Sequence, residues 1–300
     1  MENVKPFVKW AGGKGGLIFQ LKNFYPFELE NGKIDKYVEP FVGGGAVLIN
    51  ILQQYDVKEA YAFDINRDLI NCYNTIKESV EDLIKELEIK EKDFLKLESE
   101  DRQKFFYDIR KEYNSYKLEE NHNIKRASEF IFLNRTCFNG LYRVNKNGEF
   151  NVPCGKYKNP TICDAKNLRN LSKLIQNVRF EYGDYRKSSE YIDEKTFVYF
   201  DPPYRPLSIT SGFTSYTKED FNDENQKDLA KYFKELDSKN AKLMLSNSNP
   251  KNTNKEDNFF EDIYKGFNIN EISAKRMINA NAKGRGEISE LLITNYEEMN

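Results

Sequence analysis

The sequence is poor in residues on which several classes of enzyme and membrane protein depend. Its single histidine, His122, lies in a polar stretch, which argues against a Ser-His-Asp triad or a His-ligated zinc site, and we expect no metal. The four cysteines form no C-x-x-C pair, so we expect reduced thiols and a cytoplasmic location. There is no apolar run of about 18 residues and no basic-then-apolar N-terminus, so we expect neither a membrane span nor a signal peptide.

Charge is nearly balanced over the whole chain but not along it. The formal net charge of −2 does not by itself indicate a nucleic-acid partner. Residues 125–180, however, contain eleven Lys and Arg side chains against three acidic ones. A local excess of this kind is typical of a surface that binds phosphates.

Residues 201–204, Asp-Pro-Pro-Tyr, follow a β-branched and aromatic run at 196–200 that predicts a buried strand. The two prolines remove two backbone donors, so the Pro202 carbonyl has no partner in a strand ladder. A carboxylate and a free carbonyl can both accept hydrogen bonds from an amino group, and the Tyr204 ring can stack on a planar base. The alternative is a simple Pro-Pro turn that closes the strand.

Three glycines lie between a predicted strand and a predicted helix near the N-terminus. The strand covers residues 37–42, the glycines are residues 43–45, and the helix covers residues 46–52. A second strand at 61–64 ends in Asp64, about 20 residues beyond the glycines, the spacing of a ribose-binding acid in Rossmann-like units. Glu39 and Asp64 should then lie at the tips of adjacent strands. No strong cation flanks the glycines, which favours an adenosine cofactor without phosphates.

With 300 residues, 39% of them hydrophobic, the chain suits one large domain or one core with an inserted second domain. Residues 134–153 contain Lys-Asn-Gly between alternating arms, which predicts a basic β-hairpin that can enter a major groove; a solvated surface hairpin is the alternative. We also expect helices at 17–25, 46–52 and 223–236, two or three helices over 66–118, and strands at 180–185, 242–246, 267–272 and 290–294. Three loops should contact ligands. They are a glycine-rich ligand loop at 6–16, a mobile loop at 206–217 over the site, and a basic phosphate-contacting loop at 275–286.

Taken together, these motifs resemble one family, the Dam-type DNA N(6)-adenine methyltransferases of the alpha arrangement. The resemblance rests on Phe-Val-Lys-Trp-Ala-Gly-Gly-Lys at 7–14, Glu-Pro-Phe-Val-Gly-Gly-Gly at 39–45, Asp-Ile-Asn at 64–66, Phe-Asn-Gly-Leu-Tyr-Arg at 138–143, Phe-Asn-Val-Pro at 150–153 and Asp-Pro-Pro-Tyr at 201–204. It implies an α/β fold with a Rossmann-like seven-stranded sheet. Residues 1–66 and 176–300 would form the catalytic domain, and residues 67–175 a helical and hairpin target-recognition insert.

The resemblance also implies ligands and site residues. S-adenosyl-L-methionine would be the methyl donor, and a flipped-out adenine within GATC in duplex DNA would be the acceptor. The implied catalytic residues are Asp201, Pro202 and Tyr204. The implied cofactor-binding residues are Trp10, Lys14, Glu39, Gly43, Gly45, Asp64, Asp184, Tyr185 and Asp201. The implied DNA-contacting residues are Lys9, Asn139, Leu141, Arg143 and Pro153.

Other functions are compatible with parts of the pattern. One is an amino methyltransferase acting on RNA or on protein glutamine, although the latter usually has Asn where Asp201 stands and the basic hairpin argues against it. Another is a DNA-binding module that keeps the fold without catalysis. A restriction nuclease is a third, but no acid-x-Lys cluster stands out. The sequence leaves open whether a restriction endonuclease shares the target site and whether the chain is a monomer or a weak dimer.

Overall fold

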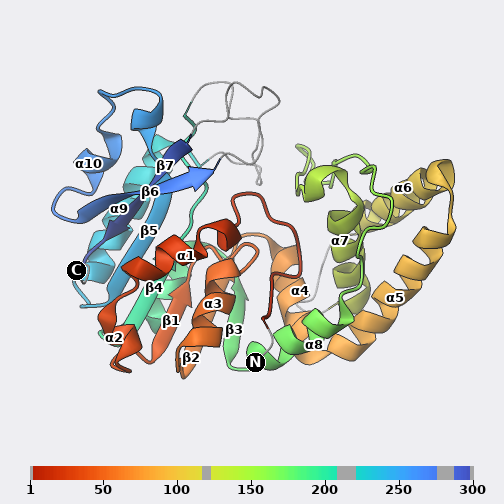
Figure 1. Cartoon of the computed structure of the whole chain (residues 1–300), viewed down its shortest axis with the longest axis horizontal. Coiled ribbons are helices and arrows are strands. Elements are labelled where there is room, and N and C mark those ends of the chain that lie inside the picture. Colours follow the sequence, from red (N-terminus) through yellow and green to blue (C-terminus); the bar gives the residue numbers. More distant parts are fainter. Residues whose placement is uncertain (1–2, 117–122, 208–220, 276–286, 298–300) are drawn as a thin grey trace.

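The chain folds into two lobes, and the computed structural model describes residues 3–116, 123–207, 221–275 and 287–297. One lobe is built on a β-sheet and the other consists mainly of helices (Figure 1). The N-terminal segment runs between the two lobes before it joins the first of them (Figure 1). Among the described residues, no helix is both long enough and apolar enough to span a membrane.

Within the described residues, seven strands form one mixed sheet in the order β3-β2-β1-β4-β5-β7-β6. Strands β1 to β5 run parallel to one another, whereas β7 is antiparallel to both β5 and β6. The Rossmann-like seven-stranded α/β sheet predicted from the resemblance is confirmed. The strands are β1 (Lys36–Glu39), β2 (Glu59–Asp64), β3 (Val178–Tyr182), β4 (Thr196–Phe200), β5 (Lys242–Ser248), β6 (Asn268–Lys275) and β7 (Glu287–Thr294).

Strand β4 shows why the centre of this sheet is stable. All five of its residues are buried, and alternate side chains point to opposite faces. Phe197 and Tyr199 pack into one hydrophobic core, whereas Val198 and Phe200 pack into a second core on the other face. A strand buried on both faces needs a continuous apolar run, so the polar residues that follow it mark the edge of the sheet.

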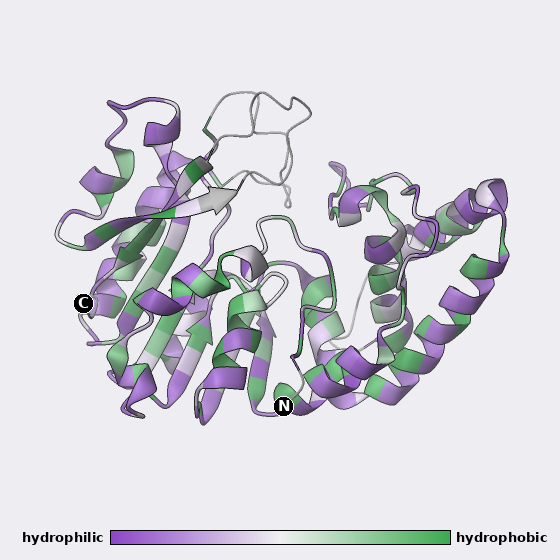
Figure 2. Cartoon of the chain, in the orientation of Figure 1, coloured by the Kyte–Doolittle hydropathy of each residue, from purple (hydrophilic) through white to green (hydrophobic). Residues whose placement is uncertain are grey.

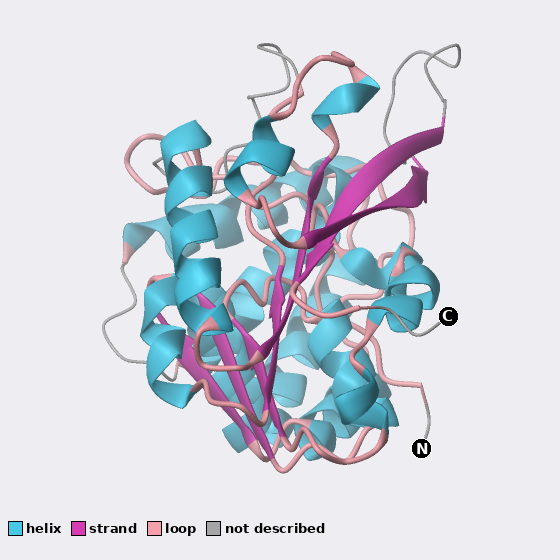
Figure 3. Cartoon of the chain, turned by 90° about the vertical axis from the view of Figure 1, so that its left-hand side faces the viewer, coloured by secondary structure: helices cyan, strands magenta, loops and turns pink. Residues whose placement is uncertain are grey.

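Helices cover both faces of the sheet (Figure 3). The first core takes Val47 and Leu48 from the helix after the glycine turn, and the second core takes Leu229 and Phe260 from helices near the C-terminus. The first face carries α1 (Ile18–Leu21), α2 (Phe27–Glu30), α3 (Ala46–Gln54) and α4 (Arg67–Glu78), and the second carries α9 (Asp223–Asp237) and α10 (Phe259–Ile263).

The second lobe is organised around one buried helix. It contains α5 (Val80–Lys96), α6 (Ser99–Ser115), α7 (Ile124–Thr136) and α8 (Ala165–Leu174). Helix α7 lies against α4, α5 and α6, and most of its residues are buried. The outer helices carry hydrophilic and hydrophobic residues along their whole length, as expected where one face is solvated (Figure 2). Together with α4, helices α5 and α6 make three helices in the described part of the range 66–118, in agreement with the predicted two or three.

The helix predicted at residues 17–25 is wrong in extent. Helix α1 covers only four residues, and single 3-10 turns flank it at Lys14–Gly16 and Lys22–Phe24. Proline at position 26 disfavours helical backbone at Tyr25, which is extended with ψ of 144°. The predicted terminal strand pair is present and longer than expected. The loops predicted at 206–217 and 275–286 lie largely outside the described residues.

Helix α4 joins the two lobes. The ring of Tyr73 stacks on Phe180 of β3, with centroids 4.4 Å apart and an interplanar angle of 8°. The same helix also packs against α7 and α8. The division between catalytic domain and insert at residue 67 stays a prediction, and α4 belongs by its contacts to both.

Candidate active site

Three acidic side chains come from the carboxyl ends of neighbouring parallel strands. Strand β1 lies between β2 and β4 and is parallel to both. Glu39 ends β1, Asp64 ends β2, and Asp201 follows β4 directly. The predicted placement of Glu39 and Asp64 at the tips of adjacent strands is confirmed, and this edge is where open α/β sheets bind ligands.

The glycine turn after β1 is held from two sides. Gly43 and Gly45 have φ of 46° and 71°, in the left-handed region that favours glycine. An added Cβ would lie 2.8 Å from Trp10 Nε1 at the first position and 2.5 Å from the Tyr73 hydroxyl at the second. The Gly43 carbonyl accepts a hydrogen bond from the Tyr73 hydroxyl at 2.9 Å. The backbone of the turn is therefore fixed in shape.

The Asp64 carboxylate closes this turn against β2. It accepts hydrogen bonds from the amides of Gly43 at 3.0 Å and Asn66 at 2.8 Å. Burial raises the pKa of Asp64 to about 6, although both amide donors act to lower it. Because a carboxylate has about four lone-pair positions, Asp64 can still accept hydrogen bonds from ligand hydroxyls.

Asp201 forms an ion pair with a buried lysine. Lys14 Nζ lies 2.6 Å from Asp201 Oδ1, and the side chains are 4% and 20% exposed. The same ammonium donates to the Gly12 carbonyl at 2.8 Å and lies 4.6 Å from the centroid of the Tyr204 ring. Burial raises the pKa of Asp201 to about 6, and Lys14 opposes that rise. Lys14, predicted to line the cofactor pocket, thus lies with the predicted catalytic residues.

Glu39 is buried beneath the glycine turn and the Lys14–Asp201 pair. It is 2% exposed and accepts a hydrogen bond from the Tyr37 hydroxyl at 2.8 Å. Burial raises the pKa of Glu39 well above its usual range, and the charge of Asp201 adds to this. Its contacts lie within the protein, since the backbone amide of Leu48 in α3 also lowers its pKa by hydrogen bonding.

Asp184 and Tyr185, the other residues predicted near the cofactor, follow β3. Asp184 is exposed and accepts a hydrogen bond from the Arg186 amide at 2.9 Å. The preceding Gly183 amide donates to the Asp64 carbonyl at 3.1 Å, which brings this turn beside β2. Tyr185 is 5% exposed, and its ring lies 5.3 Å from that of Phe41 in the second core.

The N-terminal segment connects the active-site edge to the helical lobe. The amide and carbonyl of Lys9 both bond the side chain of Asn134 on α7, each at 2.9 Å. The next residue, Trp10, contacts the glycine turn and stacks on Tyr142, with centroids 5.7 Å apart. The Lys9 ammonium lies 4.3 Å from the centroid of the Tyr157 ring. Two predicted site residues, one for DNA and one for cofactor, are therefore adjacent at the junction of the lobes.

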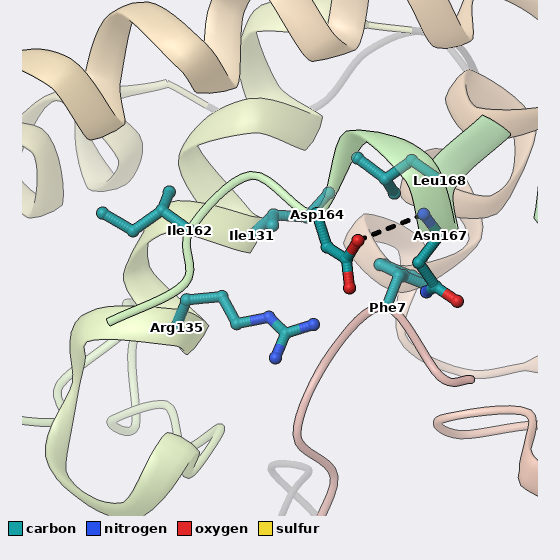
Figure 4. A pocket seen from close by; sticks show the side chains of 7 residues that line it. All are labelled: Phe7, Ile131, Arg135, Ile162, Asp164, Asn167 and Leu168. Atoms are coloured by element: carbon teal, nitrogen blue, oxygen red, sulfur yellow. Dashed lines mark hydrogen bonds between the residues drawn. The ribbon is translucent and has the colours of Figure 1, made fainter. Parts of the chain in front are cut away.

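A narrow crevice lies behind this junction, between the N-terminal segment, α7 and α8 (Figure 4). Figure 4 shows Arg135 of α7 facing Asp164, whose carboxylate accepts a hydrogen bond from the Asn167 amide at 3.1 Å. Asn167 also bonds both the amide and the carbonyl of Lys5. These contacts fix the N-terminal segment to the helical lobe.

The predicted hairpin is present as a paired loop at 137–155, without regular strands. Two isolated antiparallel bridges hold it, Cys137 with Cys154 and Val144 with Phe150. Gly148, at the tip, has φ of 81° and supplies the turn. The apolar Phe150 and Val152 turn inward and are buried, so the outward positions are left to polar side chains.

The predicted DNA-contacting residues of this loop lie mostly at the surface. Asn139, Arg143 and Pro153 are exposed, and Leu141 is half-buried. Asn139 has left-handed backbone with φ of 55°. Arg143 donates through Nε to the Asn151 side chain at 2.8 Å, which extends its guanidinium along the loop. Phe138, which was not predicted as a site residue, is 52% exposed beside Asn139.

The basic excess of residues 125–180 is smaller on the folded surface than in the sequence. Four of its eleven cations pair with acids outside the segment: Lys125 with Glu112, Arg126 with Asp68, Arg169 with Glu81 and Arg179 with Glu181. Arg126 is buried inside the helical lobe. Sequence counting cannot see these partners because most of them are far away along the chain. Six other cations of the segment are exposed: Arg143, Lys146, Lys156, Lys158, Lys166 and Lys173.

Three residues at the catalytic motif were missed by sequence reasoning. Glu290 of β7 accepts a hydrogen bond from the Tyr204 hydroxyl at 2.6 Å. Gln226 of α9 and Asn247 of β5 bond the backbone of residues 203–205. The available signal was the polar run Ser-Asn-Ser-Asn at 246–249, which ends an otherwise apolar strand at the ligand-binding edge.

Comparisons with known proteins agree with this geometry. Residues 10–278 match the family model described as D12 class N6 adenine-specific DNA methyltransferase. The chain is 53% identical to Type II methyltransferase M.MjaIII of Methanocaldococcus jannaschii, over 98% of this chain and 99% of that protein. It is 38% identical to Type II methyltransferase M1.LlaDCHI of Lactococcus lactis subsp. cremoris, over 98% and 96%. It is 33% identical to the DNA adenine methylase of Escherichia coli strain K12, over 97% and 95%. The predicted resemblance is confirmed: the chain belongs to the D12 class N6 adenine-specific DNA methyltransferases and is an enzyme of that activity.

Proposed function

We propose that this methyltransferase transfers the methyl group of S-adenosyl-L-methionine to the N6 amine of an adenine flipped out of double-stranded DNA. One observation carries the proposal. The Lys14 ammonium lies against the Asp201 carboxylate and over the Tyr204 ring. A nitrogen that donates to the carboxylate beside an aromatic ring is the arrangement that a stacked aminopurine would require.

The residues around the glycine turn fit an uncharged nucleoside. The positive φ of Gly43 requires a residue without a side chain, and the Trp10 indole packs against the turn, so a nucleoside bound at this edge would lie beside an aromatic ring. Asp64 keeps lone pairs that suit two ribose hydroxyls. Asp184 and Tyr185 lie past the end of β3, next to β2, on the side suited to the adenine of the donor. When bound, S-adenosyl-L-methionine would supply an electrophilic methyl group.

The protein groups at the acceptor act by accepting hydrogen bonds. The lone pair of the adenine amine is delocalised into the ring, which makes the amine a weak nucleophile. Two acceptors, the Asp201 carboxylate and the Pro202 carbonyl, would favour pyramidal nitrogen and stabilise the positive charge that develops on it. Tyr204, fixed through its hydroxyl by Glu290, would stack on the base. Lys14 must leave Asp201 when the target amine arrives.

The exposed loop and the N-terminal segment would read the DNA. Lys9, Asn139, Leu141, Arg143 and Pro153 come from these two elements, which are joined where Lys9 bonds Asn134 and Trp10 stacks on Tyr142. Flipping the base costs a few kcal/mol, and contacts to the vacated stack would offset that cost. We take GATC as the target, because the loop motif and the relationship to DNA adenine methylases both favour it.

The names of two relatives support a proposal about the biological role. Two of the similar proteins are named Type II methyltransferases. We therefore propose that the enzyme modifies the site of a cognate restriction endonuclease, acting as a monomer or weak dimer whose insert at 67–175 binds the target.

The test is to express the protein in a host that lacks adenine methylation and to sequence the host DNA with methylated adenines identified. We expect methylation at adenine in a single short motif, GATC. Methylation at a different motif would overturn the target but not the reaction. Incorporation of labelled methyl from S-adenosyl-L-methionine into RNA or protein, with none into duplex DNA, would overturn the proposed function.

A further inference from the structure

The backbone just after the proposed acceptor site is held by two buried side-chain amides. Gln226 Nε2 donates to the Pro203 carbonyl at 3.0 Å. Asn247 Nδ2 donates to Gln226 Oε1 at 3.0 Å, and Asn247 Oδ1 accepts from the Arg205 amide at 3.1 Å. Starting and ending on residues 203–205, this chain of hydrogen bonds forms a closed ring, which we call the amide clasp.

The amide clasp is buried, and the donor and acceptor atom of each of its hydrogen bonds can be assigned. Gln226 and Asn247 are both 0% exposed, so water does not compete for these bonds. Asn247 Oδ1 also accepts from the Ser248 amide at 2.9 Å, which fixes which atom of its side chain is oxygen. With that orientation set, Gln226 must accept from Asn247 through its oxygen and donate to Pro203 through its nitrogen.

Proline chemistry links the clasp to the neighbouring carbonyl. The pyrrolidine ring fixes φ of Pro203 near −65°. Rotation about that bond is what would otherwise turn the Pro202–Pro203 peptide plane relative to the rest of Pro203. The remaining rotation, ψ of Pro203, is restricted because Gln226 holds the Pro203 carbonyl and Asn247 holds the Arg205 amide, and this limits the directions open to the Pro202 carbonyl. Gln226 therefore controls a group with which it makes no hydrogen bond.

We propose that Gln226, oriented by Asn247, is a positioning residue that aims the Pro202 carbonyl at the target amine. The inference rests on the proposed function, because it takes Asp201 and the Pro202 carbonyl as the acceptors of the amine protons. Its consequence is that a side chain on α9 sets the rate of methyl transfer without touching donor or acceptor.

The first experiment compares two substitutions at Gln226 across pH. Gln226→Met removes both hydrogen bonds at similar size, and we expect kcat to fall about tenfold or more, since small misplacements of reacting groups are costly, with little change in the Kd for the donor. In Gln226→Glu the new carboxyl is buried, which raises its pKa, and only its protonated form can donate to the Pro203 carbonyl. Its kcat relative to wild type should rise as the pH falls from 8.5 to 6.5, whereas the relative kcat of Gln226→Met should not change.

A second experiment reads the contact without turnover. Duplexes carrying adenine or purine at the target differ only in the exocyclic amine, and their Kd values are measured with S-adenosylhomocysteine bound. The ratio of the two Kd values, compared between wild type and Gln226→Met, removes the difference in base pairing. We expect the preference for adenine to shrink severalfold in the variant.

The control is Asn71→Leu, which breaks a comparable buried clasp away from the active site. Asn71 is 1% exposed and bonds both the carbonyl and the amide of Asn123. It should lower Tm without altering kcat per folded molecule or the adenine preference. If Gln226→Met behaved in the same way, or if the kcat of Gln226→Glu stayed as low as that of Gln226→Met at every pH from 8.5 to 6.5, the positioning role would be wrong. If instead Asp201→Ala retained activity, the proposed function itself would fail.

Discussion

The active-site edge and the paired loop at 137–155 differ in how their polar side chains are held. At the edge, charged groups are buried and interlocked: Lys14 is 4% exposed and bonds both Asp201 and the Gly12 carbonyl. In the loop, the backbone is pinned by two bridges while Asn139, Arg143 and Pro153 remain exposed. The comparison shows that the groups we propose to react are held in place by burial, whereas the side chains we propose to contact DNA are held mainly through the backbone from which they extend.

The largest effect should come from the edge. Asp201→Ala removes the charged acceptor and should lower kcat on the order of 1000-fold, the upper range for losing a preorganised electrostatic contact. Donor binding should be weakened but retained, because Asp64 and the glycine turn are untouched. Single-turnover methylation and calorimetric titration measure the two separately. The control is Glu235→Ala, which removes an exposed carboxylate from α9 and should leave both unchanged. Activity of Asp201→Ala near that of the control would remove Asp201 from the reaction.

The second prediction tests whether the edge is as rigid as its packing indicates. Gly45→Ala places a Cβ 2.5 Å from the Tyr73 hydroxyl at φ of 71°. Left-handed backbone and overpacking together should lower the free energy of unfolding by about 2–3 kcal/mol. Gly15→Ala is the control, because its added Cβ meets nothing within 4 Å. Urea denaturation of both variants gives the comparison, and equal midpoints would mean that the turn can adapt.

Local sequence predicted the edge better than it predicted the connections that stabilise it. The strand before Asp201 and the turn at Gly43 could be recognised because each is encoded within about ten neighbouring residues. The bonds from Gln226, Asn247 and Glu290 could not, because they join positions 23 to 86 residues apart, which only the fold brings together. The seven-stranded sheet was implied by the resemblance, and the order of its strands was not predicted.

Charge was the least predictable property for the same reason. Counting cations along residues 125–180 gave an excess of positive charge, but Arg126 forms an ion pair with Asp68 inside the helical lobe and adds no charge to the surface. The helix predicted at 17–25 also failed, because a proline one residue beyond it sets the backbone at its end. The position of the loop at 137–155 could be predicted, but its lack of regular strands could not, since only two isolated bridges pair its arms.

The third prediction concerns the loop. Arg143→Ala should cost about 1–3 kcal/mol of discrimination at one base pair, because an exposed guanidinium can pair with a base edge in two places. Lys156→Ala, also exposed, should instead weaken binding to all sequences and reduce the slope of log K against log salt by about 1. Binding to a panel of single-base variants of the target at two salt concentrations separates the two. If Arg143→Ala changed only the salt slope, the loop would hold phosphates and read nothing.

The smallest effect should be a shift in the pH profile, and it tests how tightly the edge is coupled. Burial raises the pKa of Asp201 to about 6, and Lys14 acts in the opposite direction. Only the ionised carboxylate can both accept a hydrogen bond from the amine and stabilise the positive charge that develops on its nitrogen. Because kcat/KM reports the free enzyme, kcat/KM for DNA should therefore fall below about pH 6. In Lys14→Met the opposing charge is gone, so the pKa of Asp201 rises further and the acid limb moves to higher pH.

The same substitution also removes the ammonium that the target amine must displace. At pH 8.5, where Asp201 is ionised in both proteins, kcat/KM of Lys14→Met should therefore match or exceed the wild-type value, whereas at pH 6.5 it should be lower. Lys14→Arg keeps the charge and should keep the limb in place, and Arg143→Ala should do so as well because the loop lies outside this network. An acid limb that stayed fixed in Lys14→Met, or moved to lower pH, would mean that Asp201 does not carry the titration. Lys14 and Asp201 would then not be coupled electrostatically in a way that affects the reaction.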